Sequence, residues 1–402
     1  MRILVVNAGS SSLKSQLIET DGKVSLMKCL AEKVGTPDAY MNVSFAPDFQ
    51  KATYRVADMT VAECLKKLLE VLVDDPESPI SDLSQIDAIG NRIVAGGEYF
   101  TKSVIIDESA REKLELCEEL APLHNPPADA CIDMMAALMP NTPQVAVFDT
   151  AFHATMPPKA YMFNVPYEYY EKYAVRRYGF HGTSHRYVSH RCAQLMGKDI
   201  KDLKMITCHL GNGSSITAID GGKVIDTSMG LTPLDGFMMG SRTGTLDPSV
   251  VTFIMEKEHL TPSEMDQVLN KKSGLLGISG VSSDDRDVTK AAAEGNQRAQ
   301  LAHDILEYQI SKFIGGYLVA LGGCDAIVFT AGVGENQSHH RQVVGEYLKF
   351  LGVKIDPELN EKMVLGKEGK ISTPDSSMEV YVIPTNEELV IARDTKALVE
   401  KL

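Results

Sequence analysis

The sequence predicts an α/β protein with a duplicated fold, and two observations support this prediction. Stretches with the spacing of strands alternate with stretches of helical spacing, as is typical of α/β architecture. A strand, a Gly/Ser-rich turn and a second strand also occur twice, at residues 7–18 and again at residues 209–219. In each copy a short Asp-Gly or Gly-Gly turn leads into a third strand. Backbone N–H groups in two such turns favour a shared phosphate site.

The first part of the chain is expected to alternate between strands and helices. Ser109 is a candidate N-cap, Pro126 and Pro127 favour the start of a helix, and Asp149 ends a buried strand. The expected elements are a helix at 59–73, strands at 86–95 and 104–107, a helix at 109–120, a helix ending at 138 and a strand at 144–148.

The second part repeats the pattern with longer helices. The repeated hairpin ends near residue 226, and a strand further along runs into a glycine-rich turn at residues 332–334. The expected elements are the hairpin at 204–226, a helix at 301–321, strands at 326–330 and 380–383, and a helix at 387–402.

Composition excludes several classes of protein. The chain has 402 residues and a net charge of −14, which argues against a nucleic-acid partner or an acidic membrane surface. No apolar run approaches the length of a membrane span, and a strand at the N-terminus leaves no room for a signal peptide. The seven cysteines form no Cys-x-x-Cys pair, so we expect reduced thiols, a cytoplasmic protein and no zinc site.

Three glycine-rich turns are candidates for a nucleotide site. No Walker A motif is present, but small-residue turns follow strands at residues 9–12, 211–214 and 332–336. The third turn opens a helix whose N–H groups favour an anion. A single such turn is most often structural, whereas three of them favour a nucleotide. Lys14 beside the first turn is either a phosphate ligand or a solvated lysine.

Two arginines and two acids stand out. Arg92 lies within an apolar strand, where its charge requires a partner, either an acid such as Glu98 or a bound carboxylate or phosphate. Arg242 lies on a glycine-flanked loop and is either exposed or catalytic. Asp149 at a strand end is either a turn residue or a functional carboxylate. Glu387 opens a helix, where it complements the dipole or reaches a metal ion.

Three long motifs resemble the signatures of the acetate kinases. They are Asn-Ala-Gly-Ser-Ser-Ser-Leu-Lys at residues 7–14, Tyr-Gly-Phe-His-Gly-Thr-Ser-His at 178–185, and Ser-Met-Gly-Leu-Thr-Pro-Leu-Asp-Gly at 228–236. The resemblance implies a duplicated actin-like ATPase (ribonuclease H-like) fold with two domains around a nucleotide cleft. With the duplication, it places one domain at residues 1–150, completed by helix 387–402. The second domain, at 151–386, would bind nucleotide and form a homodimer.

The resemblance also implies functions for particular residues. Arg242, His181 and Asp149 match catalytic groups, and Asn7 and Glu387 match groups associated with Mg²⁺. The matches to substrate-binding residues are Arg92 for the carboxylate and Val94, Leu123, Phe180 and Pro233 for an apolar pocket. The matches to ATP-binding residues are Lys14, His209, Leu210, Gly211, Asn212, Gly213, Asp284, Asp285, Arg286, Gly332, Val333, Gly334, Glu335 and Asn336.

The implied reaction is reversible phosphoryl transfer from ATP to acetate, giving acetyl phosphate and ADP. Mg²⁺ is the expected metal, with Mn²⁺ as a substitute. Acetate is already an anion, so positioning and charge neutralisation would carry out a direct in-line transfer. Asp149 would orient Arg242 or a metal-bound water. Asn91 and Ala95 stand where the family usually has histidines, which affects the surroundings of Arg92 and the substrate preference.

Other readings of the sequence remain open. A propionate kinase uses the same chemistry with a roomier pocket, and one methylene changes discrimination by only about 1–3 kcal/mol. An actin-like or Hsp70-like nucleotide switch would need a further module and no anionic acceptor, and the pair Arg92 and Arg242 favours an acceptor. A catalytically inactive relative is disfavoured because the acidic, basic and loop positions are intact.

Overall fold

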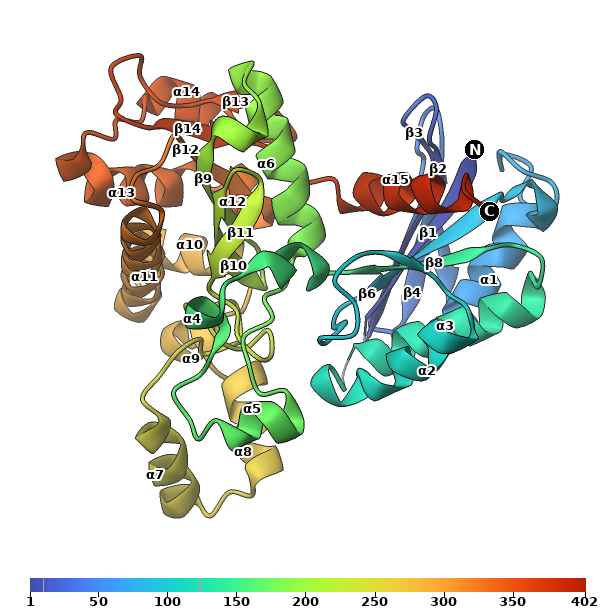
Figure 1. Ribbon diagram of the computed structural model, residues 1–402, viewed down its shortest axis with the longest axis horizontal. Helices are drawn as coiled ribbons and strands as arrows, with labels where there is room; N and C mark the ends of the chain where they lie inside the picture. Colours follow the sequence, from blue (N-terminus) through green and yellow to red (C-terminus); the bar gives the residue numbers. More distant parts are fainter. Residues whose placement is uncertain (10, 123) are drawn as a thin grey trace. The chain divides into compact units, whose positions relative to one another are not determined.

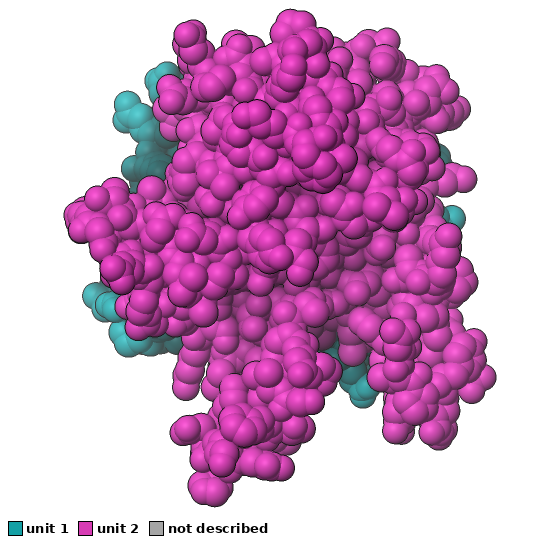
Figure 2. All heavy atoms as spheres, turned by 90° about the vertical axis from the view of Figure 1, so that its left-hand side faces the viewer, with its two compact units in different colours: residues 1–152, 386–402 teal, residues 153–385 magenta. Residues whose placement is uncertain are grey.

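The computed structural model describes residues 1–9, 11–122 and 124–402 (Figure 1). The chain divides into two compact units (Figure 2). Unit 1 comprises Met1–Phe152 and Asn386–Leu402, and unit 2 comprises His153–Thr385. The expected bounds were a division at residue 150 and a return at residue 387.

Unit 1 is built on an eight-stranded sheet in the order β5-β4-β3-β2-β1-β6-β8-β7. Strands β1, β2 and β3 pair antiparallel, whereas β1, β6 and β8 are parallel neighbours. The strands are β1 (Arg2–Ala8), β2 (Ser12–Glu19), β3 (Val24–Glu32), β4 (Tyr40–Phe45), β5 (Ala52–Arg55), β6 (Ala88–Ile93), β7 (Val104–Ile105) and β8 (Gln144–Phe148).

Alternate side chains of β1 point to opposite faces of this sheet, so both faces are apolar and helices cover both of them. Leu4 and Val6 join a core that includes Leu65 and Ile132 from one set of helices. Ile3 and Val5 join a second core with side chains of the C-terminal helix. The helices are α1 (Val61–Asp74), α2 (Glu108–Leu116), α3 (Asn125–Leu138) and α15 (Glu387–Val399), with short 3₁₀ turns η1 (Leu83–Gln85) and η2 (Glu118–Leu120).

Unit 2 repeats the strand order of unit 1. Its six-stranded sheet has the order β11-β10-β9-β12-β14-β13. The first five strands correspond to β3-β2-β1-β6-β8, with two antiparallel pairs followed by two parallel pairs. The predicted duplication is therefore confirmed. The strands are β9 (Lys204–Leu210), β10 (Ser214–Asp220), β11 (Lys223–Thr227), β12 (Ala326–Thr330), β13 (Gly369–Lys370) and β14 (Glu379–Val382).

The core of unit 2 lies between this sheet and its long helix α11, which contributes Ile310 and Ile314. The α-helices are α4 (Pro158–Tyr161), α5 (Glu168–Tyr173), α6 (Gly182–Met196), α7 (Pro248–Glu258), α8 (Pro262–Lys271), α9 (Gly274–Ser279), α10 (Asp285–Ala293), α11 (Gln297–Leu321), α12 (Ala331–Asn336), α13 (Ser338–Leu348) and α14 (Pro357–Lys362). The 3₁₀ turns are η3 (Ala151–Thr155), which spans the division, η4 (Ile200–Asp202) and η5 (Lys349–Leu351).

Most of the expected elements are present, with shifted ends. Thr60 forms a capping box at the start of α1. The prediction of Ser109 as the cap of the next helix is wrong, because Asp107 accepts from the amide of Ala110 and α2 begins one residue earlier. Among the described residues no helix is both long and apolar enough to cross a membrane, and none of the seven cysteines is paired.

Candidate active site

Arg92 on β6 is held by two neighbours within unit 1. Its Nε and Nη2 donate to Asp149 at 2.9 and 2.5 Å, and its Nη1 donates to Oδ1 of Asn7 at 3.0 Å. Parallel pairing of β6 with β1 and β8 brings these strand ends together. The acid that pairs with Arg92 is Asp149, whereas the sequence analysis offered Glu98 or another acid as the candidate. Two parallel hydrogen bonds of this kind fix the plane of the guanidinium against the plane of the carboxylate.

The guanidinium keeps donors available beyond these contacts. Arginine carries five N–H groups, and the three hydrogen bonds to Asp149 and Asn7 use three of them. Burial by itself lowers the pKa of Arg92, but the charges of Asp149, Glu387 and Glu388 raise it above the usual value. Arg92 is therefore a permanent cation, and two of its N–H groups have no partner among the residues that the structure describes.

The two departures from the family pattern do not reach this guanidinium. Asn91 points to the opposite face of β6, where its Nδ2 donates to Oε1 of Gln144 at 3.1 Å. The backbone of Ala95 is bound by Asn125 through two hydrogen bonds of 3.2 and 2.9 Å. The expected effect of Asn91 and Ala95 on the immediate partners of Arg92 is therefore absent among the residues that the structure describes.

Lys14 lies on β2 and belongs to unit 1. Its Nζ is 2.5 Å from Oε1 of Glu388 in the first turn of α15, and its side chain is half exposed. Glu388 is thus the carboxylate that neutralises Lys14, and its half-buried neighbour Glu387 raises the pKa of Arg92 more than Glu388 does. Of the two adjacent acids, Glu387 is the better placed to act beside Arg92.

In unit 2 the second glycine-rich turn meets Arg242 and His181. A Cβ atom added to Gly213 would lie 3.2 Å from Nη1 of Arg242 and 3.7 Å from Nε2 of His181. Nη1 of Arg242 also donates to the carbonyl oxygen of Pro233 at 3.2 Å. Burial lowers the pKa of Arg242. Two predicted catalytic side chains therefore converge on one face of a turn whose backbone has no side chain of its own.

His181 is fixed by a chain of contacts at the start of α6. Its backbone adopts a left-handed φ of 58°, a conformation that concentrates at functional sites in non-glycine residues. Its ring stacks on His209 at 4.1 Å, and its Nδ1 lies 2.9 Å from Oγ of Ser215. Ser215 also bonds Nε2 of His185, whose Nδ1 bonds Thr207. Both ring nitrogens of His185 therefore have partners within the protein.

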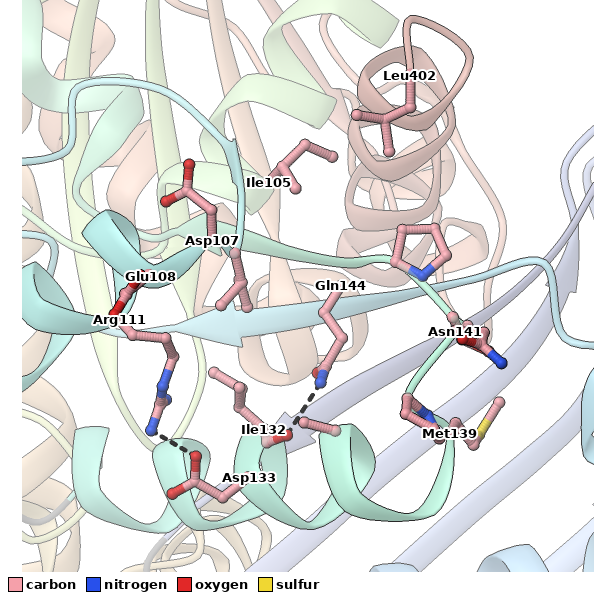
Figure 3. Close-up of a pocket in the computed structure, with 15 residues that line it drawn as sticks. Ile105, Asp107, Glu108, Arg111, Ile132, Asp133, Met139, Asn141, Gln144 and Leu402 are labelled. Carbon is pink, nitrogen blue, oxygen red and sulfur yellow. Dashed lines mark hydrogen bonds and ion pairs between the residues drawn. The ribbon is translucent and has the colours of Figure 1, made fainter.

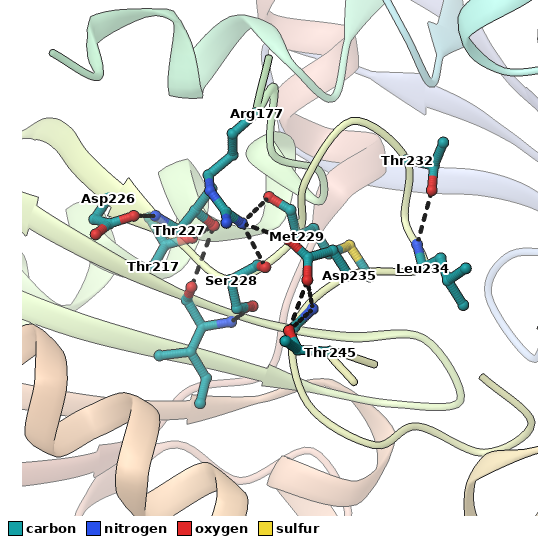
Figure 4. Close-up of polar contacts among 12 residues, drawn as sticks. Arg177, Thr217, Asp226, Thr227, Ser228, Met229, Thr232, Leu234, Asp235 and Thr245 are labelled. Atoms are coloured by element: carbon teal, nitrogen blue, oxygen red, sulfur yellow. Dashed lines mark hydrogen bonds and ion pairs between the residues drawn. The ribbon is translucent and has the colours of Figure 1, made fainter. Parts of the chain in front are cut away.

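The loop at residues 228–236 is tied to Arg177 (Figure 4). Nη1 of Arg177 donates to the carbonyl oxygens of Ser228 and Met229 at 2.7 and 3.0 Å, and it lies 3.1 Å from Oδ2 of Asp235. The other oxygen of Asp235 accepts from Thr245 at 2.6 Å. These contacts fix the loop that carries Pro233. They thereby hold the carbonyl oxygen of Pro233, which accepts the hydrogen bond from Arg242.

The predicted apolar pocket is distributed over both units. Val94 follows β6 in unit 1 and is buried, whereas Phe180 and Pro233 lie in unit 2, the first fully buried and the second half-buried. Leu123 lies outside the described residues. The grouping of these four side chains into one pocket stays a prediction.

A cavity of about 660 Å³ in unit 2 gathers most of the predicted ATP-binding residues. This volume is typical of a small-molecule site. The predicted residues that line it are Leu210, Gly211, Asn212, Asp284, Asp285, Arg286, Gly332, Val333 and Asn336. Its remaining lining includes apolar side chains such as Met238 and Ile310, which suit the face of a nucleobase. Lys14, His209, Gly213, Gly334 and Glu335 do not line it.

Several of the predicted ATP-binding residues form hydrogen bonds or ion pairs within the protein. Oε1 of Glu335 accepts from the amides of Ala331 and Thr385 at 2.8 and 3.0 Å, so it caps backbone groups. Asp284 caps α10 and pairs with Arg286, which lowers the pKa of its carboxyl group. Arg286 is itself largely exposed, with 81% of its side chain accessible, so it is the charged side chain at the cavity that is most open to a ligand.

A second cavity, of about 510 Å³, lies in unit 1 beside β7 and α2 (Figure 3). Its cation, Arg111, is 2.6 Å from Asp133 and 3.3 Å from Asp129. Because the guanidinium of Arg111 already donates to Asp129 and Asp133, the cavity is a poor site for a polyphosphate. The unit 2 cavity is the better nucleotide site.

Comparison with known proteins identifies the family. A model of the acetokinase family matches residues 2–393. The chain belongs to the acetokinase family. Relatives named acetate kinase from Thermotoga maritima and Methanosarcina thermophila are 53% and 51% identical to it. These alignments cover all of this chain and 100% and 97% of the two relatives.

Solved structures of the family have the same fold. The acetate kinase of Porphyromonas gingivalis has a TM-score of 0.93 at 44% identity. A propionate kinase of Francisella tularensis has a TM-score of 0.92 at 41% identity. Each comparison covers 99% of both chains. The predicted two-domain, actin-like ATPase fold is thus confirmed.

Sequence reasoning missed residues that support the site. Ser215 bridges two histidines, and Arg177 secures the loop of Pro233. Ser215 is the second of two adjacent serines at the start of β10, so its position in the sequence gives no special signal. Arg177 directly precedes the second family motif, at residues 178–185, which is the one signal that marks it.

Proposed function

We propose that this protein transfers the γ-phosphoryl group of ATP reversibly to the carboxylate of acetate, giving acetyl phosphate and ADP. One observation carries the proposal. Proteins named acetate kinase match the chain over its full length at about half identity, 53% in one case. The arrangement of charged side chains in each unit supports the same reaction.

The acceptor would bind Arg92. Its two N–H groups without a partner among the described residues suit a carboxylate, which accepts two parallel hydrogen bonds from one guanidinium. Asp149 and Asn7 fix the plane of that guanidinium through three hydrogen bonds. Asp149 therefore serves as a positioning residue for Arg92. Its further action on Arg242 or on a metal-bound water stays a prediction.

The nucleotide would occupy the cavity in unit 2, with its phosphates toward the turn at Gly211 and Gly213. Phosphoryl transfer spreads negative charge over the equatorial oxygens of the transferred group. Arg242 and His181, both adjacent to Gly213, would stabilise that charge. Buried donors that are already oriented make the largest contribution to such stabilisation.

The oxygen ligands in unit 1 fit a hard divalent cation. Mg²⁺ prefers carboxylate and amide oxygens and keeps several of its waters. Asn7 presents an amide oxygen whose second lone pair remains after the bond from Arg92, and Glu387 is a half-buried carboxylate near the same arginine. Asn7 and Glu387 would hold Mg²⁺, or Mn²⁺ in its place. The bound ion would supply positive charge to the phosphate oxygens.

No general base is needed, because acetate is an anion at neutral pH. The task of the protein is to hold two negative reactants in line, and fixed cations do this without proton transfer. We propose direct in-line transfer for this reason.

Propionate is the second candidate acceptor, since a propionate kinase is nearly as similar in structure to this chain as an acetate kinase is. Rates of acyl phosphate formation, trapped as the hydroxamate, would be measured with acetate, propionate and butyrate, with and without Mg²⁺. We expect the highest kcat/KM with acetate and no product without the metal. ATP hydrolysis with no acyl phosphate from any of the acids would refute the proposal, and a preference for propionate would replace acetate by propionate.

We further propose that the protein acts as a cytoplasmic homodimer. Its unpaired cysteines suit a reducing compartment. Val319 and Phe350 of unit 2 are each 84% exposed, and we expect the dimer to cover these two side chains. Light scattering coupled to gel filtration tests the dimer, and a monomer at micromolar concentration would exclude it.

A further inference from the structure

A group of histidines in unit 2 lies outside the proposed reaction. It joins the first turn of α10, the second turn of α11 and the first turn of α13, which lie in one unit (Figure 1). Its members are Asp285, His303, His339 and His340. Each offers one ligand atom, and these four atoms all lie within 4.8 Å of one another. We call these four residues the histidine cluster.

The histidine cluster is buried and contains polar atoms without partners. Asp285, His303 and His340 are 5%, 4% and 1% exposed. Six buried side-chain atoms of the described residues make no hydrogen bond, and three of them belong to this cluster: Oδ2 of Asp285, Nε2 of His303 and Nε2 of His339. Nε2 of His303 lies 3.2 Å from Oδ1 of Asp285 but is not aligned for a hydrogen bond. Buried polar atoms in native proteins are normally satisfied by protein, water or an ion.

His340 has the surroundings of a metal-binding histidine. Its Nδ1 lies 2.8 Å from Oε1 of Glu307, and its Nε2 points to Asp285 at 3.0 Å. Metal-bound histidines typically donate their second ring N–H to a carboxylate, which sets the tautomer and orients the ring. With Nδ1–H bonded to Glu307, the Nε2 atom of His340 is directed at the centre of the cluster.

We propose that the histidine cluster binds one divalent transition-metal ion, with Zn²⁺ as the best fit. Three imidazole nitrogens and one carboxylate oxygen suit zinc, which takes four ligands in tetrahedral geometry. Tetrahedral zinc ligands lie about 3.3 Å apart, so the side chains need to draw together slightly on binding. Mg²⁺, which prefers oxygen ligands, is a poor fit. The cysteine pattern predicted no zinc site, and this site uses no cysteine.

The metal would act on the wall of the nucleotide cavity. Asp285 lines that cavity together with its neighbours Asp284 and Arg286. An ion bound to Asp285 would fix the first turn of α10 against α11 and α13. We therefore infer a structural role, in which the metal stabilises unit 2 from behind the nucleotide. This site is separate from the proposed Mg²⁺ ligands Asn7 and Glu387, which belong to unit 1.

The test measures metal binding by the full-length protein without nucleotide, so it does not depend on the proposed reaction. The chelator-treated protein would be titrated with Zn²⁺, and with Co²⁺ as a visible probe. We expect one equivalent, an intense tetrahedral Co²⁺ absorption band, displacement of Co²⁺ by Zn²⁺ but not by Mg²⁺, and a higher unfolding temperature with metal. No uptake, or a weak octahedral band that Mg²⁺ removes, would overturn the proposal.

Variants separate this site from other metal sites. His303→Gln and His339→Gln should each weaken binding tenfold or more and lose the tetrahedral band, and Glu307→Gln should weaken binding by about 10–100-fold. The control is His190→Gln, because His190 is exposed on α6 and, within the described part of the chain, its ring bonds one carbonyl of its own helix. His339 is only half-buried, so its variant should fold even if His303→Gln does not. Equal Co²⁺ binding by His339→Gln and the control would show that the cluster is a hydrogen-bond network only.

Discussion

The pair formed by Arg92 and Asp149 makes a quantitative prediction about stability. The side chains are 18% and 1% exposed, and they share two hydrogen bonds. Removing one partner of a buried pair leaves the other charge uncompensated, which costs about 3–5 kcal/mol. Because Arg92 keeps some contact with solvent, we expect about 3 kcal/mol for Asp149→Asn and a similar loss for Arg92→Met.

The double variant should lose no more than either single variant, because no unpaired charge remains. The expected coupling energy is thus about 3 kcal/mol or more, obtained from the free energy of unfolding in urea for the four proteins. The control pair is Lys67 and Glu70, an exposed pair at 3.1 Å on α1, for which we expect about 0.5 kcal/mol or less. Additive effects of Arg92→Met and Asp149→Asn would show that the two side chains are not coupled, and would refute the proposal that Asp149 positions Arg92.

Other predictions concern turnover, packing and pH. Arg242→Ala should lower kcat by about 10²–10³ with little change in KM for ATP, measured by steady-state kinetics; a kcat near that of the wild type would contradict its role. Gly90→Ala should lower the unfolding temperature, since the new Cβ would lie 2.5 Å from Oγ1 of Thr395. Gly316 has open space around it, so Gly316→Ala should stabilise α11 by about 1 kcal/mol or less. Equal unfolding temperatures of the two variants would count against the packing described. Burial raises the pKa of Asp129 to about 7 from 3.8, so the folded state loses stability as pH rises from about 4 to 7, and Asp129→Asn should raise the unfolding temperature more at pH 8 than at pH 5. A larger gain at pH 5 would reverse that sign.

The sequence predicted those parts of the fold that depend on local pattern. The twin hairpins, the long helix α11 and the strand leading to Gly332 follow from spacing, turn residues and apolar runs. The cap of α2 was placed wrongly because Asp107 and Ser109 are both good N-cap residues, and only the backbone decides between them. The short helices α7 and α8 were not predicted. They bury little, and their few buried side chains leave a weak apolar pattern.

The candidate site was predictable where a motif carries it. Asn7, His181 and Pro233 lie in long family signatures, and the structure places the last two beside Arg242 or its partners. The sequence does not show which carboxylate pairs with which cationic side chain. Arg92 and Asp149 are far apart along the chain and meet only because β6 and β8 are parallel neighbours. The histidine cluster was missed for the same reason, since it joins three helices that are separate in sequence.

The place of α15 bears on how the protein is made. This helix supplies Ile391 and Ala392 to the apolar core on one face of the first sheet, yet the whole of unit 2 is translated before it. During synthesis that face of the sheet stays uncovered while unit 2 emerges from the ribosome and begins to fold. Nascent chains that stall before residue 386 should therefore expose Ile3 and Val5, which makes them substrates for chaperones and prone to aggregation.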